Sequence, residues 1–397
     1  MSEPDATTVT APHPAATSAA AAPRLLVGAL SLVVLIVAIS LPLLVVGRVL
    51  QGLAFALYPV AVSIVRDERP PERLVRSIAV ISAMLGFGAG FGLVITGLLM
   101  AEGAAYQRVF WFCTAATAVA VIAAWVVVPD RPQFVHAQID WVGGAALAVG
   151  LAALLLAITQ GSRWGWTSPG IVVSVAIGVA VMWWWWSWSR RCPNPPVSVS
   201  ILRRRSVLLG NIATLLVGMG LYFSFLGTTG FVEAPVGSGY GFDASVLDAS
   251  VEFLLPGALA AAVTALVAGR YIERFGPRVV VAAGAGAGAF GFSALMLWHT
   301  HPWQIVLAGL FTNAYISLAY GALPVLILEG VAEDETGIAT SLNAIFRKVG
   351  SAIAAAMFAD LEIPAASGYI PESAFIAIFA LGAVTALAAM LLALRRR

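Results

Sequence analysis

The stretch GRVLQGLAFALYPVAVSIVR, residues 47–66, places an arginine and a glutamine at the start of a long apolar run. A charge at the centre of a membrane-spanning helix costs roughly 2.5–3.5 kcal/mol on insertion scales, and such residues usually line a polar path. Arg48 therefore either faces a cavity or lies near the membrane interface, where a long side chain reaches the headgroups. Gln51 and Gly52 follow on the next turn and favour the cavity.

Composition extends this reading to the whole chain. Of 397 residues, 60% are hydrophobic and 11% are charged, whereas a soluble domain carries about 25% charged residues. We therefore predict an all-α, polytopic helical membrane protein. With about 20 apolar residues as the length of one span, the pattern predicts twelve spans, at residues 25–41, 43–65, 77–100, 107–128, 141–160, 169–189, 207–231, 247–269, 279–298, 302–326, 337–359 and 373–394.

Arginine placement predicts the orientation of these spans. Seventeen arginines fall in alternate segments, and only Arg108 and Arg163 fall in the others. Because positive residues favour the cytoplasmic side, both termini are expected there, in a bacterial cytoplasmic membrane. Tryptophans at the predicted span ends, including the run at 183–188, fit an interfacial aromatic belt; ligand stacking is the alternative for that run.

The start of the chain differs from the rest. Residues 1–23 are rich in Ala, Thr and Pro and lack hydrophobic periodicity, so they are expected to form a disordered cytoplasmic tail. No basic region precedes the first apolar segment, and a cleaved signal peptide is not expected.

A glycine series marks the span at 77–100. Two pairs have the G-x-x-x-G spacing, which lets helices approach closely. This face either serves plain helix packing or controls how the bundle rocks, and the sequence does not separate the two. The series comprises Gly86, Gly88, Gly90, Gly92 and Gly97.

Residues 43–128 resemble helices four to six of a major facilitator superfamily transporter, of the fourteen-spanner drug:proton antiporter type (EmrB/QacA-like). Arg48, Gln51 and Gly52 match its R-x-x-Q-G motif. The glycines from 88 to 97 match its antiporter motif, without the proline that the family version often has.

Two further segments carry the resemblance. Residues 139–143 and 160–166 are similar to the helix pair inserted between the halves of fourteen-spanners. Residues 269–278 resemble the inner-loop motif G-x-x-x-D-R-x-G-x-R, with glutamate in place of aspartate. This loop is either a charge latch between helices or a tight basic turn; its matching residues are Gly269, Glu273, Arg274, Gly276 and Arg278.

The resemblance implies a domain organisation. After the tail, residues 24–128 would form an incomplete amino-terminal half of four helices, 129–206 the inserted pair and a cytoplasmic linker, and 207–397 a complete six-helix half. In this register, the family's first two helices would have no counterpart here. A truncated gene product or a misplaced start codon would both look like this.

Several polar residues inside the spans are further candidates. Asp248 and Glu252 lie one turn apart and either couple protons or sit in the outer headgroup zone. Arg347, beside Lys348, either binds an anionic group or reaches towards the interface. Candidate cavity amides, with interhelical hydrogen bonding as their default role, are Asn211, Asn313 and Asn343.

No cofactor, metal or enzymatic activity is expected. The chain has no P-loop, nucleophile elbow or zinc helix, and His299 with His301 lacks a third ligand. The resemblance implies a proton-coupled exporter of small organic or drug-like molecules working by alternating access; the alternative is a non-transporting helix-bundle remnant or interaction protein. Expected partners are the cargo, protons and the bilayer, without nucleic acid; substrate and oligomeric state are not predicted.

Overall fold

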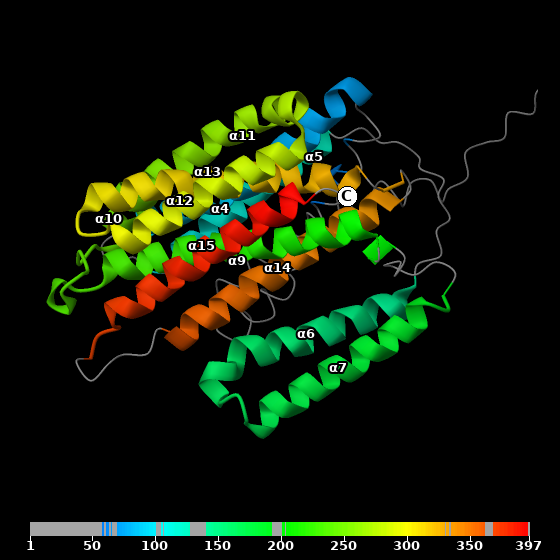
Figure 1. Cartoon of the computed structure of the whole chain (residues 1–397), viewed down its shortest axis with the longest axis horizontal. Coiled ribbons are helices and arrows are strands. Elements are labelled where there is room, and N and C mark those ends of the chain that lie inside the picture. The colour runs from blue at the N-terminus through cyan, green and yellow to red at the C-terminus, as the bar shows by residue number, and fades with distance from the viewer. Residues whose placement is uncertain are drawn as a thin grey trace, which may run out of the picture. The chain divides into compact units, whose positions relative to one another are not determined.

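The computed structural model describes residues 58, 61–62, 65, 70–100, 105, 107–127, 140–192, 201–202, 204–329, 331–332, 335–361 and 368–395. All regular structure in these ranges is helical, as predicted (Figure 1). The longer helices are α4 (Pro71–Leu99), α5 (Gln107–Val127), α6 (Trp141–Trp164), α7 (Pro169–Ser189), α9 (Arg205–Glu233), α11 (Leu255–Phe275), α12 (Pro277–Leu297), α13 (Pro302–Leu328), α14 (Thr336–Leu361) and α15 (Glu372–Leu394).

The described part of the chain contains eight segments that are long and apolar enough to cross a bilayer: α6, α7, α9, the segment ending in α11, and α12 to α15. The helix bounds agree with the predicted spans to within a few residues, except that α4 begins six residues before residue 77 and α11 ends six after residue 269. The predicted spans at 25–41 and 43–65 lie almost wholly outside the described residues.

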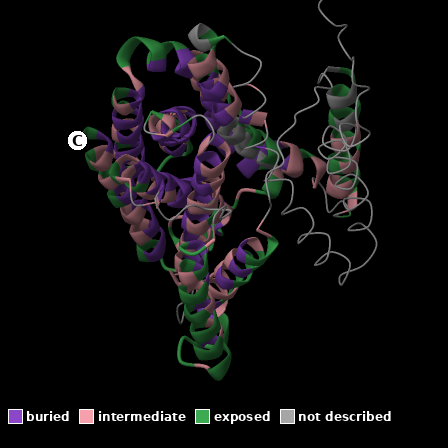
Figure 2. Ribbon diagram, turned by 90° about the vertical axis from the view of Figure 1, so that its right-hand side faces the viewer, coloured by how far each residue is buried: buried purple, intermediate pink, exposed green. Residues whose placement is uncertain are grey.

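Helix α5 belongs to one compact unit of the chain, and the other long helices belong to a second. Within the second unit, α12 packs on α13 and α15, and α9 packs on α13, α14 and α15. Buried residues gather on the inner faces of these helices (Figure 2). The α6–α7 hairpin is mostly exposed and contacts this group through Ala146 and Trp185, which pack with Val207, Ala339 and Leu342.

Small residues bring α4 against α11 and α13. A methyl group at Gly321 would lie 3.2 Å from the Ala79 carbonyl oxygen and about as close to the side chains of Ala83 and Ala268. A side chain at Gly269 would lie 2.7 Å from Arg76 Cγ. These close approaches place α4 beside the carboxy-terminal helices.

The predicted span at 247–269 is not one regular helix. It begins with the short helix α10 (Val246–Asp248), continues as a π-helical segment at Ala249–Leu254, and becomes α-helical only at Leu255. Pro256 lies in the first turn of α11 and has no N–H to donate to the carbonyl of Glu252. The π-helical hydrogen bonding therefore ends just before Pro256, the residue that would interrupt a regular α-helix.

Candidate functional site

A cationic side chain is buried in the middle of α14. Arg347 is the twelfth of 26 residues in that helix and is only 7% exposed. Its guanidinium carbon lies 4.8 Å from the centroid of the Tyr320 ring on α13, a cation–π contact. The structure therefore buries Arg347 against a neighbouring helix. Binding of an anionic group by Arg347 stays a prediction.

Helix α13 has a proline one turn after Tyr320, the residue that contacts Arg347. Pro324 lies inside the helix and has no N–H for the carbonyl oxygen of Tyr320, four residues earlier. The Tyr320 hydroxyl is also buried, and no described residue forms a hydrogen bond with it. The Tyr320 hydroxyl therefore retains hydrogen-bonding capacity on the residue whose ring contacts Arg347.

Buried amides continue this polar region along α9 and α14. Asn343 lies one turn before Arg347, and its Nδ2 donates to Thr214 Oγ1 on α9 at 2.6 Å. Asn211 lies one turn before Thr214 and is completely buried, yet neither its Oδ1 nor its Nδ2 has a hydrogen-bond partner among the residues that the structure describes. An unsatisfied amide in a membrane-spanning helix is costly unless water or a ligand reaches it.

We define the polar cluster as the five side chains that these three helices bring together. The cluster combines one fixed positive charge, a ring and hydroxyl, and amides with free donors and acceptors. Chemically, these groups can bind a polar or anionic group that reaches them. Its members are Asn211, Thr214, Tyr320, Asn343 and Arg347.

Glycines hold α9 and α14 in close contact beside the cluster. A side chain at Gly218 would overlap the carbonyl of Arg347, and one at Gly350 would overlap the carbonyl of Leu215. Ser351 Oγ donates to the Arg347 carbonyl at 3.0 Å and approaches the Gly218 carbonyl at 3.3 Å. The backbone around Arg347 is thus set by a glycine crossing between the two helices.

The predicted glycine series on α4 is only partly packed. Gly97 is buried, and a side chain there would overlap Ser250 in the π-helical segment. Gly88 and Gly92 are exposed, with no described atom close to where a methyl group would lie. Gly86 and Gly90 lie in α4 as well. A role of this face in rocking stays a prediction.

The inner-loop motif forms a turn of one residue. Gly276 joins the end of α11 to the start of α12 with φ +80° and ψ 155°. Arg274 stacks on Phe275 at 5.2 Å, and Glu273 is exposed, with no ion pair among the described residues. Arg278 instead lines a cavity. The tight turn is therefore observed, whereas the charge latch stays a prediction.

The two acidic candidates, Asp248 in α10 and Glu252 in the π-helical segment, differ in their contacts. Asp248 forms a capping box with Ser245, whose Oγ donates to Asp248 Oδ2 at 2.6 Å. Asp248 thus has a structural partner at a helix start. Glu252 lies exposed in the π-helical segment, and its coupling role stays a prediction.

The remaining candidates fall outside the cluster. Asn313 donates from Nδ2 to the Gly309 carbonyl of its own helix at 3.0 Å. His299 Nε2 lies 2.8 Å from Glu372 Oε1, and no group of three metal-ligating side chains occurs in the residues that the structure covers. Arg48, Gln51 and Gly52 lie outside the described ranges.

Sequence reasoning missed Thr214, Gly218, Tyr320 and Gly350 as parts of the site. A signal was present for most of them. Thr214 is three residues after Asn211, and Gly350 is three residues after Arg347, so each shares a helix face with a predicted residue. Tyr320 precedes a proline by four residues. Only the structure shows which of these residues contact one another across α9, α13 and α14.

Comparison with known proteins adds the following. A family model described as Major Facilitator Superfamily matches residues 23–355. The chain is 24% identical over 325 residues to the multidrug resistance protein Stp of Mycobacterium tuberculosis, covering 81% of this chain and 59% of that protein. It is 27% identical over 342 residues to the tetracenomycin C resistance and export protein of Streptomyces glaucescens, covering 84% and 61%.

A third relative has a different cargo in its name. The uridine/deoxyuridine transporter of Lactococcus lactis subsp. cremoris is 25% identical over 332 residues, covering 80% of this chain and 67% of that protein. The chain thus spans about three fifths of the length of the first relatives that it matches.

Proposed function

Because the chain belongs to the major facilitator superfamily, we propose that it is a proton-coupled membrane transporter that exports small organic or drug-like molecules by alternating access. The family and its relatives indicate a membrane transporter rather than an enzyme. Export of drug-like cargo is supported by the two relatives named for drug resistance. Nucleoside-like cargo is the second candidate, supported by the uridine/deoxyuridine transporter.

The single observation that carries the proposal is the buried polar cluster around Arg347. A transporter of this type places its cargo near the membrane midplane between helices. Arg347 lies near the middle of α14, with its guanidinium over the face of Tyr320. In this proposal the guanidinium and the free amide of Asn211 hold polar groups of the cargo, and the Tyr320 ring stacks on its apolar part.

In this proposal, residues outside the polar cluster couple proton movement to transport. Arg48 tunes proton exchange with a nearby acid, Gln51 supports it by hydrogen bonding, and Glu252 is the protonatable candidate on the described part of the chain. The glycine crossing of α9 and α14 gives the two helices a contact that can pivot without clashing side chains.

Cargo accumulation in a host that lacks its own drug exporters tests the proposal. Cells that express the parent chain should accumulate less of a fluorescent amphipathic dye, and an uncoupler should abolish the difference. Arg347→Gln should remove most of the export, and Arg347→Lys should restore it only in part because lysine keeps the charge but not the flat stacking group. Membrane expression of each variant is measured in parallel.

Arg163→Gln is the matched control, because Arg163 lies at the exposed end of α6 outside the polar cluster. It should export at the parent rate. If the parent itself does not change dye or uridine accumulation, the chain is a non-transporting helix bundle and the proposal is wrong. If Arg347→Gln exports like the parent, the chain transports by another site.

A further inference from the structure

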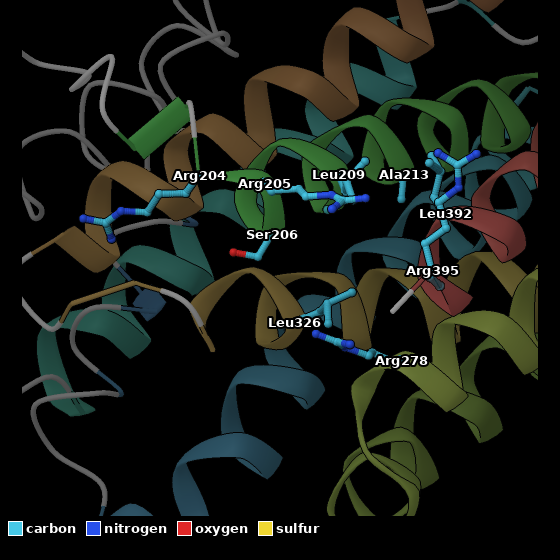
Figure 3. Close-up of a pocket in the computed structure, with 11 residues that line it drawn as sticks. Arg204, Arg205, Ser206, Leu209, Ala213, Arg278, Leu326, Leu392 and Arg395 are labelled. Carbon is cyan, nitrogen blue, oxygen red and sulfur yellow. The ribbon is translucent and has the colours of Figure 1, made fainter. Parts of the chain in front are cut away.

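A cavity of about 410 Å³ opens at the ends of α9, α12, α13 and α15, apart from the polar cluster. Its wall contains four arginines from three different segments (Figure 3). This volume falls in the range of small-molecule sites, about 300–1,000 Å³. The four cationic residues are Arg204, Arg205, Arg278 and Arg395.

One of the four arginines is neutralised within the protein. Arg204 forms a two-pronged ion pair with Glu335, with Nη1–Oε2 at 2.7 Å and Nη2–Oε1 at 3.1 Å. Its side chain is directed away from the other three (Figure 3). Arg205, Arg278 and Arg395 have no carboxylate within ion-pair distance among the described residues. Three like charges therefore share one cavity, an arrangement that an anion would stabilise.

Two of the four helices, α9 and α12, begin at the cavity, and the other two, α13 and α15, end there. Arg205 is the first residue of α9, and Arg278 is the second residue of α12. Free N–H groups at helix starts carry partial positive charge and bind phosphate and other anions. Arginine adds paired N–H donors that match phosphate oxygens. The arginines and helix starts at the cavity therefore suit a phosphate group.

Apart from the arginines, the cavity wall is largely apolar. Leu209 and Ala213 follow along α9, and Leu326 and Leu392 face them from α13 and α15. Leu208 and Leu391, next to these wall residues, are exposed on helices long enough to span a bilayer. A phosphate held at the helix ends would thus have apolar surface running from it into the membrane. Basic pockets between spanning helices are typical sites for anionic lipid headgroups.

We propose that this cavity binds the phosphate group of an anionic membrane lipid, with Arg205, Arg278 and Arg395 as its ligands. Arg204 holds the start of α9 through Glu335 and leaves the three others free for the headgroup. The acyl chains lie along the apolar wall and the adjoining faces of α9 and α15.

The full chain, purified in a neutral detergent, allows a direct test. Native mass spectrometry should show a retained adduct with phosphatidylglycerol and much less with phosphatidylcholine, and phosphatidylglycerol should raise the apparent unfolding temperature. The triple variant Arg205→Gln/Arg278→Gln/Arg395→Gln should bind phosphatidylglycerol at least about tenfold more weakly. Equal binding of both lipids by the parent, or unchanged binding by the triple variant, would overturn the proposal.

Arg190→Gln/Arg191→Gln/Arg270→Gln removes the same charge from exposed positions that do not line the cavity, and it should bind phosphatidylglycerol like the parent. An equal loss in this control would mean that only net charge matters and would overturn the site. If the first triple variant does not fold, Arg395→Gln alone, beyond the last residue of α15, should still weaken binding several-fold.

Inorganic phosphate separates a lipid from a free anion. At equal concentration it should stabilise the parent far less than phosphatidylglycerol does, because it has no acyl chains for the apolar wall. Equal stabilisation by inorganic phosphate, lost in the triple variant, would overturn the lipid assignment and identify a free-anion site.

Discussion

The amide nitrogen of Asn343 on α14 lies 2.6 Å from the hydroxyl oxygen of Thr214 on α9, and both side chains are buried. Thr214 Oγ1 in turn donates to the Gly210 carbonyl of its own helix at 2.9 Å. One hydroxyl thus accepts across the helix pair and donates along its own helix. This relay is a direct polar link between α9 and α14, next to the glycine crossing.

Thr214→Val should weaken the contact between α9 and α14. Valine keeps the shape of threonine but leaves the Asn343 amide without this partner. The free energy of unfolding should fall by about 0.6 kcal/mol, the average for such bonds within membranes, and by no more than about 2 kcal/mol. Denaturant unfolding in detergent measures the change. Thr264→Val is the control, because Thr264 bonds only to carbonyls of its own helix; a loss as large there would contradict the assignment.

Gly350→Ala should separate α9 from α14. The added methyl group would meet the backbone carbonyl of Leu215, which cannot move aside as a flexible side chain can. We expect a loss of about 1–3 kcal/mol of unfolding free energy, the usual cost of overpacking, despite alanine's higher helix propensity. Gly88→Ala on α4, where no described atom lies close, should be neutral or stabilising. The same unfolding assay compares the two, and equal effects would refute the close crossing.

Most helix bounds could be predicted from the sequence, and the reason is physical. Spans in a bilayer need a minimum apolar length, and polar or special residues interrupt that length. The segment at 169–189 was predicted with both ends as observed, since Ser168 caps it, Pro169 begins it and Arg190 follows it. Asn343 and Arg347 were singled out for the same reason, because polar side chains are rare inside spans.

The rest depended on contacts between distant segments. Nothing in the local pattern around Gly218 shows that the Arg347 carbonyl lies against it. The π-helical segment before Leu255 was missed because a change in hydrogen-bond spacing leaves no mark in composition, and only Pro256 hinted at it. The cavity arginines were used to predict orientation, whereas their assembly follows from the packing of four helices.

Gly276→Ala should strain the turn between α11 and α12. With φ +80° and ψ 155°, the backbone of Gly276 lies in a region that is essentially restricted to glycine. We expect a loss of about 1–3 kcal/mol in unfolding free energy. Gly286→Ala in the middle of α12, where the nearest atom is Met390 Sδ at 3.6 Å, should cost little. Thermal unfolding compares the stability of the two variants. A Gly276→Ala protein as stable as the parent would show that the turn adopts another backbone conformation without cost.

Asp140 should make stability depend on pH at the start of α6. Its Oδ1 accepts from the Gly143 amide at 2.7 Å, and its Oδ2 accepts from Trp188 Nε1 at 3.0 Å. These bonds, that from Gly143 first, hold the pKa of the Asp140 carboxyl below its ordinary value of 3.8. A carboxylate with a lowered folded-state pKa stabilises the fold above its unfolded pKa, and this contribution is lost as the pH falls through the folded pKa.

Asp140→Asn supplies the comparison, because asparagine can cap the helix but does not titrate. Above pH 5 the parent should be more stable than the variant by a constant amount, and the difference should shrink as the pH falls below the ordinary pKa of aspartate. Unfolding in detergent at a series of pH values measures it. Trp188→Phe removes one of the two bonds and should move the acid transition of the parent towards higher pH. If the difference between parent and Asp140→Asn stays constant down to low pH, these hydrogen bonds do not favour the charged carboxylate, and the link between α6 and α7 is independent of its ionisation.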